Sequence, residues 1–247
     1  MVAMARIAIL VPTYNERDNI SLLLDEVFKN LSNRNHDSHI VVIDDSSPDG
    51  TGDLVKKITE TNDHVHLLSR AGKLGLGSAY IDGLRWSLSN LSPDIFIQMD
   101  ADLSHPPSYL PNLAEGVLEG YDVIIGSRYV KGGGSTSWSW YRRIISHGAN
   151  LLVRLMLGIK EEDATSGFRA LSKRAVKFLL KFTLSSRGYS YQIESLFLYS
   201  KLGLPIKEVP IIFHGRKKGR AKLSISEILS FAFLLIRLRT IKFKFSK

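Results

Sequence analysis

The first 126 residues alternate short apolar runs with amphipathic helical patterns, and this alternation restricts the fold more than any other feature of the sequence. The predicted strands are Arg6–Val11, His39–Asp44, Val65–Ser69, Asp94–Met99 and Val123–Gly126. The predicted helices between them are Asn19–Leu31, Thr51–Glu60, Gly77–Ser89 and Tyr109–Gly120. Continuous apolar strands separated by helices indicate an α/β, Rossmann-like fold with a mostly parallel central sheet and helices on both faces. Right-handed crossovers bring the carboxyl ends of such strands to one edge, where ligands bind.

The pattern loosens after Arg128. Residues Lys131–Trp140 are rich in glycine and serine but carry two tryptophans, which favours a mobile loop. The remaining predicted elements are helices over Arg142–Leu157, Lys173–Lys181 and Tyr189–Leu202, a turn into a strand over Asp163–Leu171, and a late strand over Lys207–Phe213. The chain has no cysteine, which excludes disulfides, cysteine-ligated metals and a cysteine nucleophile. Its first residues lack the features of a signal peptide and are predicted to lead into the first strand.

Polar residues follow three of the predicted strands at the point where each strand ends. These segments are Pro12–Glu16, Asp44–Gly50 and Asp100–Asp102. Asp100 and Asp102 project the same way in an extended segment, and their like charges repel unless a cation lies between them. A hard divalent ion that also binds a diphosphate would relieve this repulsion. The alternative is a solvated carboxylate pair at a strand end.

The residues after the first two strands can form a nucleoside site. Pro12 and Tyr14 offer an apolar and aromatic platform. Glu16 and Asp45 offer acceptors for ring N–H groups or ribose hydroxyls. Lys73 precedes a glycine-rich helix start that lacks the ending of a P-loop, and it is a candidate neighbour of the phosphates.

The last part of the chain combines an apolar helix with the whole net charge. Ile228–Ile236 is apolar around the full helix circumference, but a bilayer-spanning helix needs about 20 residues. The net charge is +9, and residues 216–247 hold ten basic residues and one acidic residue. A helix in the membrane interface, with its cations among lipid head groups, fits this pattern. A helix docked on the core or on another subunit is the alternative. We therefore predict a main domain of residues 1–224 and an interfacial membrane segment of residues 225–247.

Two tryptophans precede the predicted helix that starts at Arg142. Trp138 and Trp140 could form a lid or guide a substrate at the membrane–water boundary, where tryptophan is enriched. The alternative is a loop anchored by two buried indoles.

Seven motifs occur along the chain in the order PTYNERDN, DDSSPDGT, GKLGLGSAY, DADLSHPP, GSRYV, SGFRAL and FHGRKKGRAKLS. Together they resemble the dolichol-phosphate (polyprenyl-phosphate) mannose synthase group of family 2 glycosyltransferases, from about Ile7 to about Ser224. The resemblance implies a GT-A catalytic domain over residues 1–224, GDP-mannose as donor, and Mg²⁺ or Mn²⁺ as cofactor. It also implies a dolichyl or polyprenyl phosphate acceptor at the cytoplasmic face of a membrane. The expected product is a β-linked mannosyl phospholipid, formed by a single inverting displacement.

The resemblance further implies roles for individual residues. The positions that contact the nucleotide match Pro12, Tyr14, Glu16, Ile43 and Asp45. The metal and diphosphate segment matches Asp100, Ala101 and Asp102, with the two aspartates as metal ligands. The basic residues that face the phosphates match Arg128, Arg216 and Lys222, and these three with Asp102 are the expected catalytic residues. Ala221 stands where the late motif usually has serine, which removes a hydroxyl contact with phosphate.

Neutralisation of charge is the expected mechanism. The nucleotide diphosphate and the lipid phosphate are both anions, so a metal and a ring of basic residues must cancel their repulsion. A phosphate nucleophile is already deprotonated at neutral pH and needs no strong general base. Gln192 and Glu194 are candidates to line the sugar or metal pocket. His105 and His147 are predicted to be structural, with His105 holding the loop after Asp102.

Three alternatives stay open. The same fold could use UDP-glucose or a UDP-N-acetylhexosamine, because spacing defines neither the base nor the sugar. A non-enzymatic protein could bind a membrane or nucleic acid through the basic end, although the clustered carboxylates would repel nucleic acid, so we expect no nucleic-acid partner. The chain could also be a catalytic module that works with a transmembrane region or a membrane-protein partner.

Overall fold

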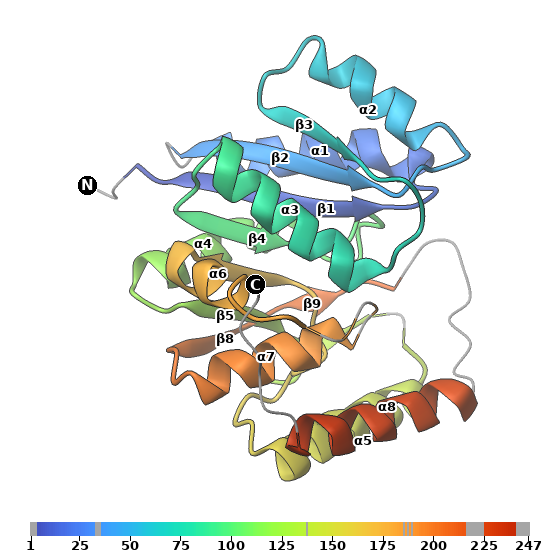
Figure 1. Cartoon of the computed structure of the whole chain (residues 1–247), viewed down its shortest axis with the longest axis vertical. Helices are drawn as coiled ribbons and strands as arrows, with labels where there is room; N and C mark the ends of the chain where they lie inside the picture. Colours follow the sequence, from blue (N-terminus) through green and yellow to red (C-terminus); the bar gives the residue numbers. More distant parts are fainter. Residues whose placement is uncertain are drawn as a thin grey trace.

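A computed structural model describes residues 4–32, 36–136, 138–184, 186, 188, 190–215 and 225–240. Its main strands are β1 (Arg6–Thr13), β2 (Asp37–Asp44), β3 (Val65–Ser69), β4 (Ile95–Gln98), β5 (Val123–Ser127), β7 (Arg169–Ser172) and β8 (Ile206–Pro210). They form one seven-stranded sheet in the order β3-β2-β1-β4-β7-β5-β8 (Figure 1). Neighbouring strands are parallel except where β7 pairs antiparallel with β4 and β5. The mostly parallel sheet predicted from the sequence is therefore confirmed.

The position of β7 is the feature of the sheet that the sequence pattern did not predict. A strand was expected near this site, but hydrophobic periodicity does not reveal which strands are neighbours. In the structure Phe96 of β4 pairs with Leu171, and Ile124 of β5 pairs with Ala170. Since β4 and β5 stay parallel to each other across β7, the residues after both strands still reach the same edge.

Helices cover both faces of the sheet. One set is α1 (Arg17–Leu31), α2 (Thr51–Thr59) and α4 (Leu110–Leu118), with a 3₁₀ turn (Pro107–Tyr109) before α4; the other is α3 (Leu76–Asn90), α6 (Lys173–Leu179) and α7 (Tyr191–Lys201). Alternate residues of β1 show how the two cores form. Ile7, Ile9 and Val11 pack with the first set, whereas Ala8 and Leu10 pack with the second. All five are fully buried, as expected for a parallel strand covered on both faces.

Two further helices, α5 (Trp140–Leu157) and α8 (Ile225–Thr240), lie side by side at one end of the molecule, below the sheet in Figure 1. On α8, Leu234, Leu235 and Leu238 are buried in the core, whereas Phe233 and Ile236 are exposed. One side of this apolar helix therefore packs on the protein, as expected for a helix docked on the core. Another side is exposed. No helix among the described segments combines the length and hydropathy needed to cross a membrane.

The glycine-rich stretch after β5 is partly regular. Gly134–Ser135 (β6) pairs in parallel with Ile212–Phe213 (β9), so two residues of the predicted mobile loop form a strand. The predicted late strand is divided between β8 and β9. This small ribbon places the ring of Trp138 against Phe213, with 5.5 Å between the ring centroids.

Candidate active site

The carboxyl ends of β1, β2 and β4 meet at one edge of the sheet, on the right in Figure 1. Thr13 pairs with Asp44, so β1 and β2 end side by side. The loops that follow contain three residues with a left-handed backbone: Asn15 (φ 61°), Ser46 (φ 54°) and Leu103 (φ 61°). This conformation costs a non-glycine residue roughly 1–3 kcal/mol and is found disproportionately at ligand sites. Backbone strain therefore collects at the edge where the sequence predicts a site.

Asp44 organises the loop after β2. Its carboxylate accepts hydrogen bonds from Oγ1 of Thr13 over 2.8 Å, from Oγ of Ser47 over 2.6 Å and from the backbone N–H of Ser47 over 3.0 Å. These bonds join the ends of β1 and β2 from within. The ligand-binding role that the sequence suggests for the neighbouring Asp45 stays a prediction.

Asp45 is buried and paired with Arg70, whose Nη1 donates to Oδ1 over 2.8 Å. Arg70 also donates from Nη2 to Oγ of Ser78 over 2.6 Å, and its Nε lies 3.2 Å from Oδ2 of Asp82. Burial raises the pKa of Asp45, and the Arg70 guanidinium opposes that rise. The sequence pattern does not reveal Arg70 as a site residue, because its partner is 25 residues away. Its place directly after the third predicted strand is the signal that could have located it.

Tyr14 and Lys73 lie together at the mouth of this edge. Tyr14 is 38% exposed, and Nζ of Lys73 lies 4.4 Å from the centre of its ring. This cation–π contact brings Lys73 to the site, as its sequence position suggested. Glu16 is half-buried and accepts a hydrogen bond from Nδ2 of Asn19 over 2.7 Å. An aromatic face, a cation and a carboxylate are thus grouped after β1.

Pro12 and Ile43 pair with each other in the register of β1 and β2. Pro12 is half-buried, whereas the side chain of Ile43 is fully buried. The helix α3 lies so close that a Cβ added to Gly83 would stand 2.6 Å from Cδ1 of Ile43. The side chain of Ile43 therefore has no surface open to a ligand, and contact between this residue and a nucleotide, expected from the resemblance, stays a prediction for its backbone.

Asp100, Ala101 and Asp102 follow β4 directly. Ala101 is buried, and the two aspartates are partly exposed. The backbone N–H of Asp100 donates to Nδ1 of His105, and the backbone N–H of Ser104 donates to Oδ1 of Asp102, each over 3.0 Å. The loop therefore folds back on itself and holds both carboxylates at the end of the strand.

The buried ring of His105 supports this loop from the protein interior. It stacks on Phe168 at a centroid distance of 5.0 Å and meets Phe213 edge-on at 5.6 Å. Burial lowers the pKa of His105, and Asp100 and Asp102 offset that effect only partly. The imidazole is therefore neutral near pH 7, and its Nδ1 accepts the Asp100 N–H. The prediction that His105 holds the loop after the paired aspartates is confirmed.

Arg128 reaches the same edge from the end of β5 and is clasped by Asp163. Its Nε donates to Oδ2 over 2.7 Å, and its Nη2 donates to Oδ1 over 2.6 Å and to Oγ1 of Thr165 over 2.8 Å. Burial alone would lower the pKa of Arg128, but Asp163 and, more weakly, Asp100 raise it above its usual value. The cation is thus permanently charged and lies within electrostatic reach of Asp100. The sequence pattern does not reveal Asp163, which is fully buried and 35 residues from its partner.

The two tryptophans of the glycine-rich stretch have opposite surroundings. Trp138 is half-buried, with Arg128 5.0 Å and Arg142 4.6 Å from its ring. Trp140 is 76% exposed at the first position of α5. The alternative of buried indoles therefore applies to Trp138 but not to Trp140.

Glu194 is fully buried on α7, but its partners are structural. It accepts the backbone N–H of Ser186 over 2.7 Å, and Nη2 of Arg237 on α8 lies 4.0 Å from the same oxygen. The carboxylate thus ties the C-terminal helix to the domain. These contacts favour a structural role for Glu194 over the sugar pocket.

Gln192 is buried on the same helix, and its amide has no hydrogen-bond partner among the residues that the structure describes. A Cβ added to Gly167 would stand 3.3 Å from Nε2 of Gln192 and 3.6 Å from Cε1 of His105. The amide therefore lies close to the histidine that supports the paired aspartates. A buried amide without a partner is a candidate for contact with a ligand hydroxyl or phosphate.

Arg216 and Lys222 lie outside the described residues, so their expected role stays a prediction. The chain just before them does reach the site. The backbone N–H of His214 donates to the carbonyl oxygen of Ser104 over 3.1 Å. The segment that leads to Arg216 therefore starts beside the loop of the paired aspartates.

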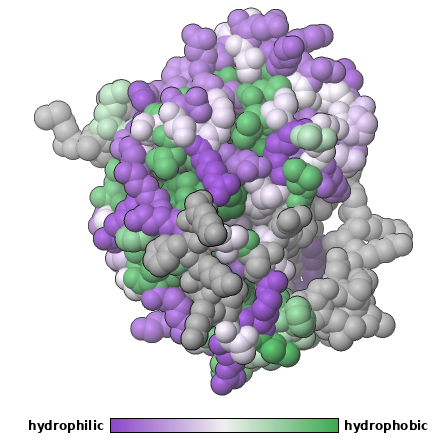
Figure 2. All heavy atoms as spheres, viewed as in Figure 1, coloured by the Kyte–Doolittle hydropathy of each residue, from purple (hydrophilic) through white to green (hydrophobic). Residues whose placement is uncertain are grey.

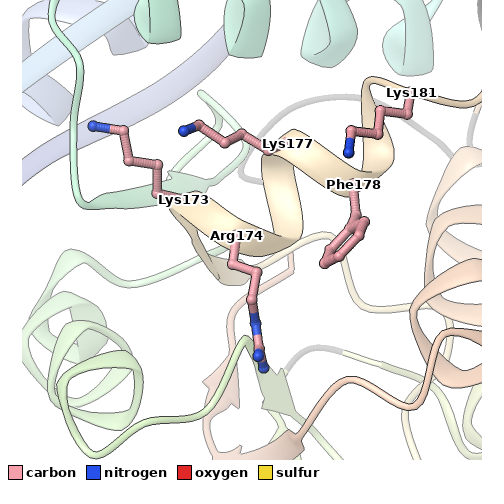
Figure 3. Close-up of a pocket in the computed structure, with 5 residues that line it drawn as sticks. All are labelled: Lys173, Arg174, Lys177, Phe178 and Lys181. Atoms are coloured by element: carbon pink, nitrogen blue, oxygen red, sulfur yellow. The ribbon is translucent and has the colours of Figure 1, made fainter.

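A separate hollow on α6 is not part of this site. It is lined by Lys173, Arg174, Lys177, Phe178 and Lys181 (Figure 3). Arg174 is already paired with Asp122. Because β7 runs antiparallel to its neighbours, α6 begins at the opposite edge of the sheet from the paired aspartates.

The donor atoms after β4 suit a hard divalent cation. Asp100 and Asp102 supply carboxylate oxygens at a partly exposed strand end, and Mg²⁺ and Mn²⁺ prefer such ligands. The hydrogen bonds from the Asp100 N–H to His105 and from the Ser104 N–H to Asp102 orient this segment. Among the described contacts, no side-chain cation lies at hydrogen-bond distance from the Asp100 carboxylate. The residues present therefore fit the metal that the resemblance implies.

The fold and the carboxylates at its strand ends are those of a GT-A glycosyltransferase. Residues 8–180 match the model of the family described as Glycosyl transferase family 2, and the chain belongs to that family. It is 38% identical to the polyprenol monophosphomannose synthase of Mycolicibacterium smegmatis, over 90% of this chain and 83% of that relative. It is 40% identical to the undecaprenyl-phosphate mannosyltransferase of Micrococcus luteus, over 89% of this chain and 88% of that relative.

Solved structures agree on the fold. A glucosyl-3-phosphoglycerate synthase from Mycobacterium tuberculosis, in complex with Mn²⁺, UDP-glucose and phosphoglyceric acid, aligns with a TM-score of 0.65. The alignment covers 96% of this chain and 81% of that chain at 23% identity. The solved structure confirms the expected fold. The expected enzyme family is confirmed by the family model and the two relatives.

Proposed function

We propose that this enzyme transfers mannose from GDP-mannose to a polyprenyl or dolichyl phosphate and forms a β-mannosyl phospholipid. The names of the two curated relatives support the sugar and the class of acceptor. The observation on this chain that carries the proposal is the convergence of Asp45, the Asp100–Asp102 segment and Arg128 at one sheet edge. An edge that combines a nucleoside site, a metal site and a fixed cation suits transfer between two anions.

The donor nucleotide would lie across the ends of β1 and β2. Tyr14, with Lys73 against its ring, offers a stacking face for the base and a cation near the phosphates. Asp45 and Glu16 are the proposed acceptors for base N–H groups and ribose hydroxyls. The Arg70 network holds Asp45 in place before the donor arrives, which lowers the entropic cost of binding.

The diphosphate would lie at the end of β4. A divalent ion bound by Asp100 and Asp102 would neutralise the diphosphate and stabilise the departing nucleoside diphosphate. The chain itself supplies the rest of the electrostatic arrangement. His105 positions Asp100, the Ser104 N–H orients Asp102, and Asp163 anchors the charge of Arg128. Groups fixed in this way need no reorganisation when charge develops in the transition state.

The acceptor phosphate would attack the anomeric carbon in one step. Its second pKa is about 6, so it is largely a dianion at neutral pH and needs no general base. The new bond joins the anomeric carbon to a phosphate oxygen of the lipid, and the bond to the donor diphosphate breaks on the opposite side. We assign Arg128, Arg216 and Lys222 to the charges of the two phosphate groups, and Gln192 to the sugar.

A membrane surface would present the lipid acceptor to α5 and α8. Among the side chains that the structure describes, the large apolar ones exposed on these helices are Trp140, Tyr141, Ile144, Ile145, Leu151, Leu152, Leu155, Phe233 and Ile236. Exposed arginines, Arg143, Arg154 and Arg239, lie on the same two helices. Apolar side chains mixed with cations are typical of interfacial helices. The opposite end of the molecule, around α2, is mostly hydrophilic (Figure 2), so we propose that the α5–α8 end faces the cytoplasmic leaflet.

A panel of donors tests the proposal. The enzyme is incubated with undecaprenyl phosphate, MnCl₂ and one of three radiolabelled donors: GDP-mannose, UDP-glucose or UDP-N-acetylglucosamine. Labelled product that partitions into organic solvent is then counted. GDP-mannose alone should give acid-labile labelled lipid. Product from UDP-glucose and none from GDP-mannose would contradict the proposed donor, and no lipid product from any donor would contradict the proposed acceptor.

A further inference from the structure

Four side chains whose atoms can bind metals lie at the amino ends of β2 and β3. This is the opposite end of the strands from the paired aspartates, which follow the carboxyl end of β4. Asp37 begins β2, His39 follows in the same strand, and His64 directly precedes β3, which is the edge strand. His66 lies next to His39 from β3. We refer to Asp37, His39 and His64 as the histidine cluster. The eight residues of β2 separate it from Asp44 by about 23 Å at the usual rise of a strand.

The spacing of the histidine cluster suits a single small cation. Nε2 of His39 lies 3.1 Å from Oδ1 of Asp37, and Nδ1 of His64 lies 3.8 Å from the same oxygen. One ligand atom from each residue lies within 4.8 Å of the others. Ligands about 2.1 Å from a tetrahedral ion are about 3.4 Å apart, so small side-chain rotations would complete the geometry. His64 can make such a rotation, because its side chain is 52% exposed.

The surrounding residues orient two of the three ligands. Nδ1 of His39 lies 3.1 Å from Nε2 of His66 and can donate a hydrogen bond to it, which would leave Nε2 of His39 to bind an ion in place of its contact with Asp37. Nε of Arg6 donates to Oδ2 of Asp37 over 2.6 Å and leaves Oδ1 on the histidine side. Metal-binding histidines and carboxylates usually have outer partners of this kind.

We propose that Asp37, His39 and His64 bind one Zn²⁺ ion, with the fourth position open to water. Two imidazoles and one carboxylate suit zinc, whereas Mg²⁺ prefers an all-oxygen octahedron. The site therefore differs in chemistry from the carboxylate pair after β4. A bound ion would join the start of β3 to β2 and fasten the edge strand of the sheet. Nδ1 of His64 also lies 3.1 Å from the carbonyl oxygen of Ser38, and the metal would replace that contact.

The test measures zinc binding directly on tag-free protein. All proteins in the test carry Asp102→Asn, which removes one carboxylate of the pair after β4 so that this pair competes less for zinc. In this parent protein we expect one equivalent of Zn²⁺ to bind in competition with a chromophoric chelator. The melting temperature should rise when ZnCl₂ is added. His64→Gln should bind zinc at least about 10-fold more weakly and lose the thermal shift. His66→Gln, which removes only an outer partner, should weaken binding by about 10-fold.

Two controls keep the outcome decisive. His64 is exposed, so the His64→Gln protein should keep the fold and the melting temperature of the metal-free parent. His147→Gln removes an exposed histidine on α5 and should leave zinc binding unchanged. The proposal is overturned if the parent protein binds no zinc. It is equally overturned if His64→Gln binds zinc as tightly as the parent does. Replacement of Zn²⁺ by Co²⁺ should give the visible absorption of a tetrahedral ion, and an octahedral spectrum would contradict the geometry.

Discussion

The guanidinium of Arg128 is joined to the fully buried carboxylate of Asp163 by hydrogen bonds of 2.7 and 2.6 Å. This pair connects the end of β5 to the loop before β7. It holds a permanent positive charge within electrostatic reach of Asp100, at the edge where the diphosphate of the donor is proposed to lie. The position of the proposed catalytic cation thus depends on Asp163, a residue with no exposed surface.

Asp163→Asn should lower both stability and turnover. Removal of one partner from a buried ion pair leaves Arg128 uncompensated, at a cost of about 3–5 kcal/mol in the free energy of unfolding. Denaturant unfolding measures that loss of stability. Steady-state kinetics should show that kcat falls more than donor affinity, because a displaced Arg128 would no longer stabilise the charge that develops in the transition state. The exposed neighbour Glu162 supplies the control variant Glu162→Gln, which should match wild type. Wild-type kcat in a folded Asp163→Asn protein would contradict this role.

Asp102→Asn should abolish most transfer while leaving the fold intact. The side chain is partly exposed, so stability should change little. Loss of a metal ligand and of its charge at the diphosphate should reduce kcat/KM by about 100- to 1,000-fold. Lipid-extractable product formed per minute measures the effect. Asp53→Asn, an exposed aspartate on α2, is the matched control. Undiminished transfer by Asp102→Asn would show that the paired aspartates do not bind the metal that acts in the reaction.

Stability should fall as the pH drops below about 6.5. Burial lowers the pKa of His105, so the unfolded chain, with a histidine pKa of about 6.5, binds a proton that the folded protein excludes. The contribution is therefore complete above pH 6.5 and declines below it, by at most about 1.4 kcal/mol per pH unit for this group. Urea unfolding from pH 7.5 to 5 gives the slope.

The variant His105→Asn isolates this effect. Its amide oxygen can still accept the Asp100 N–H, but the side chain does not titrate. The variant should be less stable than wild type at pH 7.5 because the ring contacts with Phe168 and Phe213 are lost, and the difference should shrink as the pH falls. His147→Gln is the exposed control. A stability difference that is constant with pH would contradict a buried, neutral His105.

Vesicle binding should depend on the outward side of α5. Ile144 and Leu155 are 61% and 73% exposed, and glutamate at both positions would place charge in the membrane interface. Sedimentation with anionic vesicles should weaken by at least about 10-fold, because burial of each apolar side chain contributes about 1.5–3 kcal/mol. Donor binding should be unchanged. Leu22→Glu, at an exposed position of α1, is the matched control. Unchanged sedimentation of the double variant would contradict the proposed membrane face.

These point variants test the membrane face better than removal of residues 225–247 does. Leu234, Leu235 and Leu238 are buried, and Arg237 approaches Glu194 within 4.0 Å. Deletion would therefore expose core surface and leave Glu194 without that cation. Loss of membrane binding in such a truncation could follow from unfolding alone.

The sequence predicted most of the elements because hydrophobic periodicity is a local property. Val65–Ser69 agrees residue for residue, and the first strand was predicted two residues too short at its carboxyl end. The sequence also placed the paired aspartates correctly, directly after a buried strand. The three strands that are followed by polar residues, β1, β2 and β4, are neighbours in the sheet. Local pattern and chain direction were sufficient for these features.

The remaining features depend on contacts between distant residues. The pairs Arg128–Asp163 and Asp45–Arg70 join residues 35 and 25 positions apart, and no spacing rule predicts them. The burial of Ile43 under α3 and the insertion of β7 between β4 and β5 follow from packing in three dimensions. For the same reason the sequence could not show which side of α8 would dock and which would stay exposed.

The most direct measurement is anomalous scattering from crystals grown with GDP-mannose and MnCl₂. We predict one strong manganese peak at bonding distance from carboxylate oxygens of Asp100 and Asp102 and from the diphosphate of the donor, with the guanine near Tyr14 and Asp45. A donor bound at this edge with no manganese at the two aspartates, or a donor bound elsewhere on the protein, would contradict this prediction.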